Sequence, residues 1–375
     1  MRLVFVSFYP AYPPVTGAAA VTWNCARFAG GDRALVQLGN TAAEEMREGV
    51  RVITVPGATE QRWRRVAQLP RKLRALAAAC RQLAPESVVL EGASWALYHA
   101  LLLRRLRRQL PAVRVVYHAH NVEYLLRQGK HGRVVRWLTR WAEGHVLRHA
   151  DHAFAVSDCD AMEFERLYGV RPALLPNGVD VARFEAVTPA EILAAREKYG
   201  LTGQPVLFMG LYSYRPNREA VDFLVRAFPD IVADCPQARL AVLGERLPFA
   251  RPWLLNTGSV PYAELPAVVR ACAVGTAPIF SGSGTRLKIL EYLAAGLPVV
   301  STAKGAEGLA LRSEEHLLVC RPEQFAAATV RLLRDAALAA RLGAAGHREV
   351  AVRYAWPVIM SAFDRGIATG GVVRE

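Results

Sequence analysis

Apolar residues follow two spacings along this 375-residue chain. Short apolar runs, such as those at 3–7 and 88–91, predict buried strands. Longer stretches such as 96–110, in which apolar residues recur every three or four positions, predict amphipathic helices. Strands and helices follow one another in alternation, which is the pattern of a parallel sheet covered by helices on both faces. The chain is therefore predicted to be an α/β protein.

The alternation breaks once, at PNGVD (176–180), and then starts again, so we place a domain boundary after this motif. Two doubly wound sheets would form a cleft, with ligands at the carboxyl ends of the strands. In the first half, the predicted strands are 3–7, 34–38, 50–55, 88–91, 113–118, 153–157 and 173–175, and the helices run from 18 and over 66–83, 96–110, 134–149 and 160–168. In the second half, the strands are 206–209, 240–243, 274–277, 299–300 and 317–319, and the helices are 190–199, 221–228, 264–271, 285–295 and those from 322 onward.

The stretch 280–309 carries the clearest candidate chemistry in the chain. A loop ending at Gly284 leads to Thr285, which occupies a helix N-cap position. Backbone N–H groups of such a loop, together with the positive end of the helix dipole, can hold a phosphate. Arg286 and Lys288 add positive charge to the first turn, where cations are unfavourable unless an anion binds.

One turn later, Glu291 is a carboxylate on an otherwise apolar helix, and it could accept hydrogen bonds from sugar hydroxyls as acidic residues do in dinucleotide sites. The alternative for the whole stretch is a turn followed by a core helix whose charged residues face water. The sequence leaves both interpretations open.

Composition bounds the class of protein. Charged residues make up 21% of the chain and apolar residues 52%, which is typical of a folded protein with hydrophobic cores. The six cysteines form no CxxC pair and are expected to be reduced core residues in a cytoplasmic protein. The first apolar run is too short for a signal peptide, and no run is long enough to span a membrane.

The net charge of +14 is concentrated in one part of the chain. Residues 62–148 contain 18 Lys and Arg but only four acidic residues, and the rest of the chain is balanced. Apolar residues recur at helical spacing among these basic ones, which favours contact with an anionic membrane surface. The alternative is a solvated helix face. Nucleic acid is not expected as a partner, because aromatic and basic residues do not alternate along a strand.

Several motifs together resemble a known family. In chain order they are YPPVTG, VVYHAHNVEY, HADHAFAVSDCD, LPNGVD, FMGLYSYRPNREAVDFL, GSGTRLKILEYLAAGLPVVST, GAEGL and RYAW. In order and spacing the chain resembles the retaining, nucleotide-sugar-dependent glycosyltransferases of family four, with the GT-B fold. The resemblance implies two Rossmann-like domains facing across a cleft: an acceptor-binding domain at 1–185, a donor-binding domain at 186–355 and a final helix at 356–375 that returns to the first domain.

The sequence departs from this family at three points, of which one is Ala18, which follows Gly17 where a second glycine is common. The usual signature has two glutamates eight positions apart, but here the first position is Ser283 and only Glu291 remains. Glu307, in GAEGL, is the candidate replacement, and its alternative is an exposed loop residue. The loop after the first strand of the second domain lacks the Arg and Lys with which many family members clamp the diphosphate. We infer that Arg286 and Lys288 take over much of that role.

The resemblance and the residues together give a set of expected site residues. His120, at the end of a first-half strand, matches the family's histidine that lines the sugar pocket, and His118 is the alternate. We expect His120, Arg286 and Lys288 to be catalytic. The expected donor contacts are Gly17, Gly210, Asn217, Ser283, Gly284, Thr285, Leu287, Glu291 and Glu307.

The sequence therefore predicts a retaining hexosyltransferase that moves a sugar from a nucleotide-sugar donor to a glycan or lipid-linked acceptor in polysaccharide biosynthesis. No metal or cofactor is expected, because the candidate donor stretch 280–309 contains no DxD metal motif. The protein is expected to be cytoplasmic and peripherally bound to the inner face of the membrane. Two alternatives remain: a nucleotide-sugar epimerase of the same fold, and an inactive nucleotide-sugar-binding protein. The sequence does not identify the sugar, the base, the acceptor or the oligomeric state.

Overall fold

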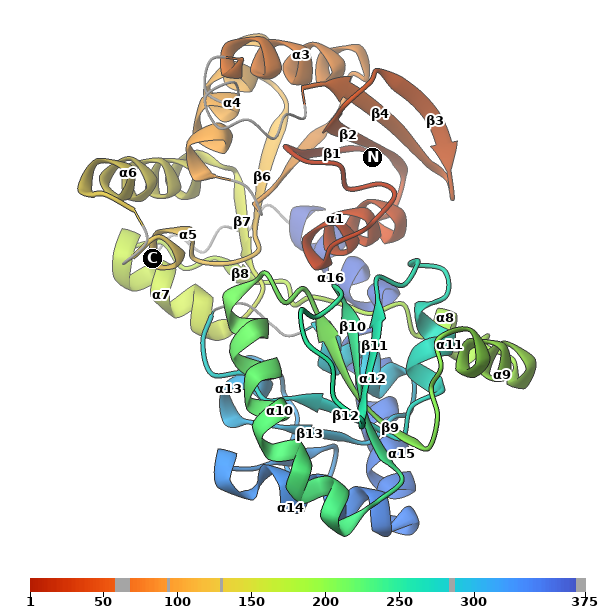
Figure 1. Ribbon diagram of the computed structural model, residues 1–375. Helices are drawn as coiled ribbons and strands as arrows, with labels where there is room; N and C mark the ends of the chain where they lie inside the picture. The colour runs from red at the N-terminus through yellow and green to blue at the C-terminus, as the bar shows by residue number, and fades with distance from the viewer. Residues whose placement is uncertain (58–67, 93–94, 129–130, 283–286, 369–375) are drawn as a thin grey trace. The chain divides into compact units, whose positions relative to one another are not determined.

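The computed structural model describes residues 1–57, 68–92, 95–128, 131–282 and 287–368. The chain forms two compact units: Met1–Asn177 with Trp356–Glu375, and Gly178–Ala355. Each unit is built on a parallel sheet, which confirms the predicted α/β class (Figure 1). None of the helices in the described part of the chain is both long and apolar enough to span a bilayer.

The described part of unit 1 contains an eight-stranded sheet in the order β3-β4-β2-β1-β5-β6-β7-β8. All neighbours are parallel except β3 and β4. The strands are β1 (Arg2–Ser7), β2 (Asp32–Gly39), β3 (Ala43–Arg47), β4 (Val50–Pro56), β5 (Ser87–Glu91), β6 (Arg114–Ala119), β7 (His152–Ala155) and β8 (Ala173–Leu174). The helices are α1 (Gly17–Phe28), α3 (Leu69–Gln82), α4 (Ala96–Gln109), α5 (Glu123–Leu126), α6 (Arg133–His149), α7 (Asp158–Tyr168) and α16 (Trp356–Ala368).

Helices cover both faces of the unit 1 sheet. On one face, α3, α4 and α6 contribute Leu76, Leu102 and Val146 to a core shared with alternate residues of the strands. On the other face lie α1 and α16, which contact each other. The ring of Phe363 on α16 lies 6.2 Å from that of Phe5 and 5.4 Å from that of Phe154 between centroids, so a segment that follows unit 2 in sequence completes this face.

Unit 2 contains a six-stranded, all-parallel sheet in its described part, in the order β11-β10-β9-β12-β13-β14. Leu207 and Met209 pack with α11 and α12, while Val206 and Phe208 pack with α10 and α14 on the other face. The strands are β9 (Gln204–Gly210), β10 (Ala238–Gly244), β11 (Leu254–Gly258), β12 (Val274–Ala277), β13 (Val299–Ser301) and β14 (Leu318–Val319). The helices are α8 (Val181–Glu185), α9 (Pro189–Lys198), α10 (Arg215–Asp234), α11 (Leu265–Arg270), α12 (Leu287–Ala294), α13 (Ala303–Ala306), η1 (Pro322–Gln324), α14 (Phe325–Arg334) and α15 (Ala336–Arg353).

The structure corrects several element assignments. The helix predicted at 221–228 is too short, because α10 already begins at Arg215, with Pro216 in the first turn where proline is tolerated. Strands β3 and β11 were not predicted, because each is an edge strand with a weak apolar pattern. All six cysteines are free as expected, but Cys159 is exposed on α7 and is not a core residue.

Candidate functional site

A buried cluster of charged and polar side chains lies at the carboxyl ends of the unit 1 strands. Glu91 ends β5, His118 lies in β6, and His120 directly follows β6. The Oε2 atom of Glu91 is 2.6 Å from Nε2 of His120 and 3.2 Å from Nδ1 of His118. Because β5 and β6 are adjacent and parallel, their carboxyl ends bring these three residues together. The predicted His120 is therefore held by a carboxylate, and the alternate His118 shares that partner.

Helix α1 and the loop after β1 add a second layer of contacts. The Thr22 hydroxyl donates to Oε2 of Glu91 at 3.2 Å, and the Tyr9 hydroxyl lies 2.9 Å from the Thr22 oxygen. The Nε2 atom of His99 donates to the main-chain oxygen of Glu91 at 2.9 Å. Both the side chain and the backbone of Glu91 are thus fixed, and a rigid carboxylate fixes the orientation of the His120 ring.

The charges in this cluster follow from burial and pairing. Burial alone would raise the pKa of Glu91, but His118 and His120 outweigh it and hold that pKa well below its ordinary value, so Glu91 is ionised. Burial lowers the pKa of His120 against the opposing effect of Glu91. An ionised carboxylate accepts from Nε2–H, so the neutral His120 ring keeps Nδ1 as a hydrogen-bond acceptor.

The same cluster contains the one group of metal-ligand type among the described residues. The Cys25 thiol, Glu91 and His118 offer ligand atoms that all lie within 4.8 Å of one another. Burial raises the pKa of the Cys25 thiol well above its ordinary value, and the negative charge of Glu91 raises it further. The Cys25 thiol is therefore neutral when no cation is bound. The candidate metal-ligand atoms of the cluster then contact one another.

In unit 2 the structure brings together three of the predicted site residues, the donor contacts Gly210 and Asn217 and the catalytic candidate Lys288. Gly210 ends β9, Asn217 lies in the first turn of α10, and Lys288 lies in the first turn of α12. The Nζ atom of Lys288 donates to Oδ1 of Asn217 at 3.0 Å and lies 4.0 Å from the centroid of the Phe208 ring. A Cβ atom on Gly210 would come within 2.5 Å of Nδ2 of Asn217, so only glycine leaves room for this arrangement.

Glu291 lies one turn beyond Lys288 on α12 and is half-buried. Its burial raises the pKa to about 7, and the opposing charges of Arg183 and Lys288 only partly offset this effect. A carboxylate with a pKa near neutrality switches between hydrogen-bond donor and acceptor in the physiological range. The predicted contact Leu287 is half-buried at the start of the same helix.

The remaining predicted contacts fall into two groups. Gly17 is the exposed first residue of α1, directly after the N-cap Thr16. Glu307 follows α13 and pairs with Lys304, so its carboxylate already has a cationic partner. The other four predicted residues, which include the catalytic candidate Arg286, lie outside the described residues: Ser283, Gly284, Thr285 and Arg286.

Sequence reasoning missed two carboxylates at these sites. Glu91 was read only as the end of a strand, although a charged residue that directly follows the apolar run VVL is the signal that could have identified it. Glu219 on α10 accepts a hydrogen bond from the Ser281 hydroxyl at 2.6 Å and pairs with Arg215 at 2.7 Å. It contacts the loop that leads to Ser283, where the expected glutamate is missing.

Both halves of the chain match models of known protein families. Residues 25–183 match the model of Glycosyltransferase Family 4, and residues 203–335 match that of Glycosyl transferases group 1. Among solved structures, the sucrose-phosphate synthase (tll1590) of Thermosynechococcus elongatus has a TM-score of 0.79 at 19% identity, over 98% of this chain and 99% of that one. The fold is therefore the GT-B fold that the sequence predicts.

Two curated relatives are mannosyltransferases. The GDP-mannose-dependent monoacylated alpha-(1-6)-phosphatidylinositol monomannoside mannosyltransferase of Corynebacterium glutamicum is 26% identical over 253 residues, which cover 61% of this chain and 66% of the relative. The phosphatidyl-myo-inositol mannosyltransferase of Mycobacterium leprae is 31% identical over 231 residues, which cover 58% of this chain and 59% of the relative. The chain thus spans less than two thirds of the length of either relative.

Proposed function

The chain belongs to the group 1 glycosyltransferases of family four, and from that premise we propose that it transfers a sugar from a nucleotide-sugar donor to an acceptor hydroxyl with retention of anomeric configuration. The proposal rests mainly on the observed position of Lys288. Its ammonium group lies at the start of α12, beside Asn217 and the side-chain-free Gly210. A cation beside open backbone at the carboxyl edge of a parallel sheet suits a diphosphate.

In this proposal the donor is held mainly by unit 2. Lys288 and Arg286 stabilise the diphosphate, whose negative charge grows as the glycosidic bond breaks. Glu291, when ionised, accepts hydrogen bonds from the ribose hydroxyls. His120 of unit 1, fixed through Glu91, offers Nδ1 as an acceptor to a hydroxyl of the transferred sugar. No protein nucleophile is assigned. The acceptor hydroxyl attacks on the face that the leaving group vacates, and the leaving phosphate takes its proton.

We further propose an acceptor that is linked to a lipid. The names of both mannosyltransferase relatives contain a phosphatidylinositol-type lipid. The positive charge of this chain is concentrated in 62–148, which suits contact with an anionic membrane surface. We expect peripheral association with the cytoplasmic face of the membrane and a reaction that needs no metal ion.

A donor panel tests this function. Purified protein is incubated with GDP- and UDP-linked sugars, with and without a chelator, and the released nucleotide and the sugar products are measured. Slow hydrolysis of one donor that resists chelation, and a product with the donor's anomeric configuration by NMR, support the proposal. Interconversion of two nucleotide sugars would identify an epimerase instead, and binding without turnover would identify an inactive binding protein.

A further inference from the structure

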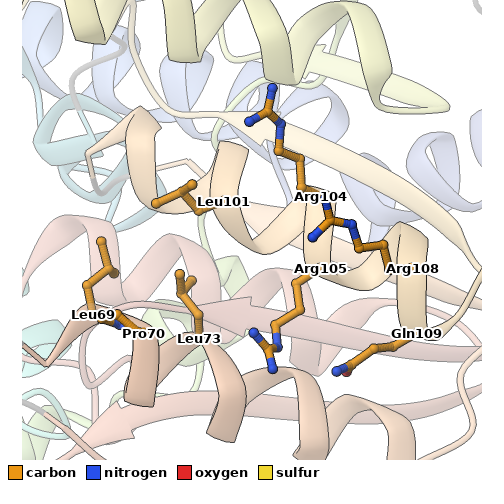
Figure 2. Close-up of a pocket in the computed structure, with 8 residues that line it drawn as sticks. All are labelled: Leu69, Pro70, Leu73, Leu101, Arg104, Arg105, Arg108 and Gln109. Carbon is orange, nitrogen blue, oxygen red and sulfur yellow. The ribbon is translucent and has the colours of Figure 1, made fainter.

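A cavity of about 470 Å³ lies between helices α3 and α4 of unit 1 (Figure 2). Its lining divides into two parts. Leu69 and Leu73 of α3 and Leu101 of α4 form an apolar part, and Arg104, Arg105 and Arg108 of α4 form a basic part. Figure 2 shows the three leucines on the left of the view and the Arg105 head group directed toward α3, whereas the Arg104 head group is directed the opposite way. The cavity therefore presents an apolar surface beside a concentrated positive charge.

The basic part has unused hydrogen-bonding capacity. The Nε atom of Arg105 is buried and has no hydrogen-bond partner among the described residues. Figure 2 shows the Arg105 side chain reaching from α4 toward α3, across the cavity. Arg108 is exposed, and within the described part of the chain no carboxylate pairs with Arg104, Arg105 or Arg108. A buried guanidinium nitrogen without a partner indicates that a ligand with acceptor atoms belongs there.

Neighbouring contacts fix two of the arginines on α4. The guanidinium of Arg104 lies 5.1 Å from the centroid of the Trp141 ring on α6, which orients it by a cation–π contact. Arg107, on the same helix, is turned away and pairs with Asp151 at 2.8 Å. Asp151 is thus engaged with a different arginine, and no ion pair among the described residues compensates the charge of the cavity.

We propose that this cavity binds one molecule of an anionic phospholipid, with the phosphate on Arg105 and Arg108 and an acyl chain along Leu69, Leu73 and Leu101. Arginine matches phosphate through two parallel N–H donors, so a phosphodiester satisfies the free Arg105 nitrogen directly. The volume exceeds the needs of inorganic phosphate and suits a head group with several methylenes. The site deepens the membrane contact proposed above, but it takes no part in sugar transfer.

A soluble probe separates this site from general charge attraction. Binding of dihexanoyl phosphatidylglycerol, below its micelle concentration, is measured by calorimetry on the full-length protein without any sugar donor. The variants are Arg105→Gln, Arg105→Lys and the control Arg81→Gln, which removes an exposed charge from α3 outside the cavity. We expect one saturable site, weakened about tenfold or more in both Arg105 variants and unchanged in the control. Melting temperatures confirm that each variant is folded.

Three results would overturn the proposal. Wild-type affinity in Arg105→Lys would mean that only net charge matters, and equal competition by inorganic phosphate would mean that the acyl part plays no role. Absence of saturable binding to the wild-type protein would remove the site altogether. A lipid with longer acyl chains should bind about fourfold more tightly for each methylene that enters the cavity. Donor hydrolysis, measured separately, should be equal in all variants, so failure here is distinct from failure of the transferase proposal.

Discussion

Glu91→Gln is the substitution that tests the unit 1 cluster most directly. The carboxylate is fully buried and accepts hydrogen bonds from Thr22, His118 and His120, which lie on α1, in β6 and directly after β6. Glutamine keeps the shape but brings an N–H₂ group into a position where only acceptors fit. At least one ring nitrogen of the two histidines would then face another donor.

The size of the effect follows from these contacts. Hydrogen bonds to a charged group contribute about 1.5 to 3 kcal/mol each, and a buried donor left without a partner costs about 1 to 3 kcal/mol. All three contacts end on Oε2, so a glutamine whose carbonyl oxygen takes that position keeps them only as hydrogen bonds to a neutral group, and its N–H₂ faces Nδ1 of His118 from the Oε1 position. A neutral bond contributes about 1 kcal/mol less than a charged one, so we expect the free energy of unfolding of unit 1 to fall by about 3 kcal/mol. For a unit of this size that corresponds to a loss of about 6 to 12 °C in melting temperature.

The pH dependence of this loss has a definite sign. The folded-state pKa of Glu91 lies below its ordinary value of 4.5, because the two histidines stabilise the ionised form. A depressed pKa contributes stability above the unfolded pKa, and this contribution disappears as the pH falls through the folded one. The difference between wild-type protein and Glu91→Gln should therefore be full at neutral pH and shrink below about pH 4.5.

Thermal and urea unfolding between pH 3 and 8, beside steady-state kinetics, measure these effects. If His120 acts on the sugar, loss of its orientation should also lower kcat by about a hundredfold. The matched control is Glu86→Gln, which removes an exposed carboxylate that accepts from the Arg2 backbone just before β5 begins. A Glu91→Gln variant with wild-type stability at neutral pH would refute the assigned network, and normal kcat would refute the role of His120.

Three further perturbations address unit 2. Lys288→Ala should lower kcat about a hundredfold and raise donor KM less, and wild-type kcat would exclude a role in leaving-group stabilisation. Because the pKa of Glu291 is raised to about 7, the affinity for the donor should rise about tenfold between pH 6 and 8, as measured by calorimetry. The Glu291→Gln variant should not show this rise. Gly305→Ala would place a Cβ atom 2.3 Å from Oγ of Ser301, so urea unfolding should show that the free energy of unfolding falls by about 1 to 3 kcal/mol. The control is Gly132→Ala, because a Cβ atom there would have no other atom within 4 Å.

The sequence predicted the fold class and the buried strands, because a strand covered on both faces leaves a continuous apolar run. It predicted α12 and its end, where Gly296 adopts a positive φ of 73°. It did not predict β3, whose AEEMR sequence forms an edge strand through backbone pairing with β4 alone. Such pairing leaves almost no trace in side-chain polarity.

The candidate site residues differ in how local their sequence signals are. His120 and Lys288 stand beside strand and helix ends that the apolar pattern locates. Glu91 is 29 positions away from His120, and its role depends on the adjacency of β5 and β6, which a single sequence does not specify. Glu219 likewise depends on the packing of α10 against the loop that contains Ser281.

The position of α16 has a consequence for the order in which the polypeptide folds during its synthesis. This helix places Phe363 against Phe5 and Phe154, and Asp364 accepts a hydrogen bond from the Gly30 backbone at 2.8 Å. The ribosome makes these partners first and must translate all of unit 2 before α16 emerges. Until then one face of the first sheet exposes its aromatic side chains, so nascent unit 1 should be the better substrate for chaperones and unit 2 the first to reach protease resistance.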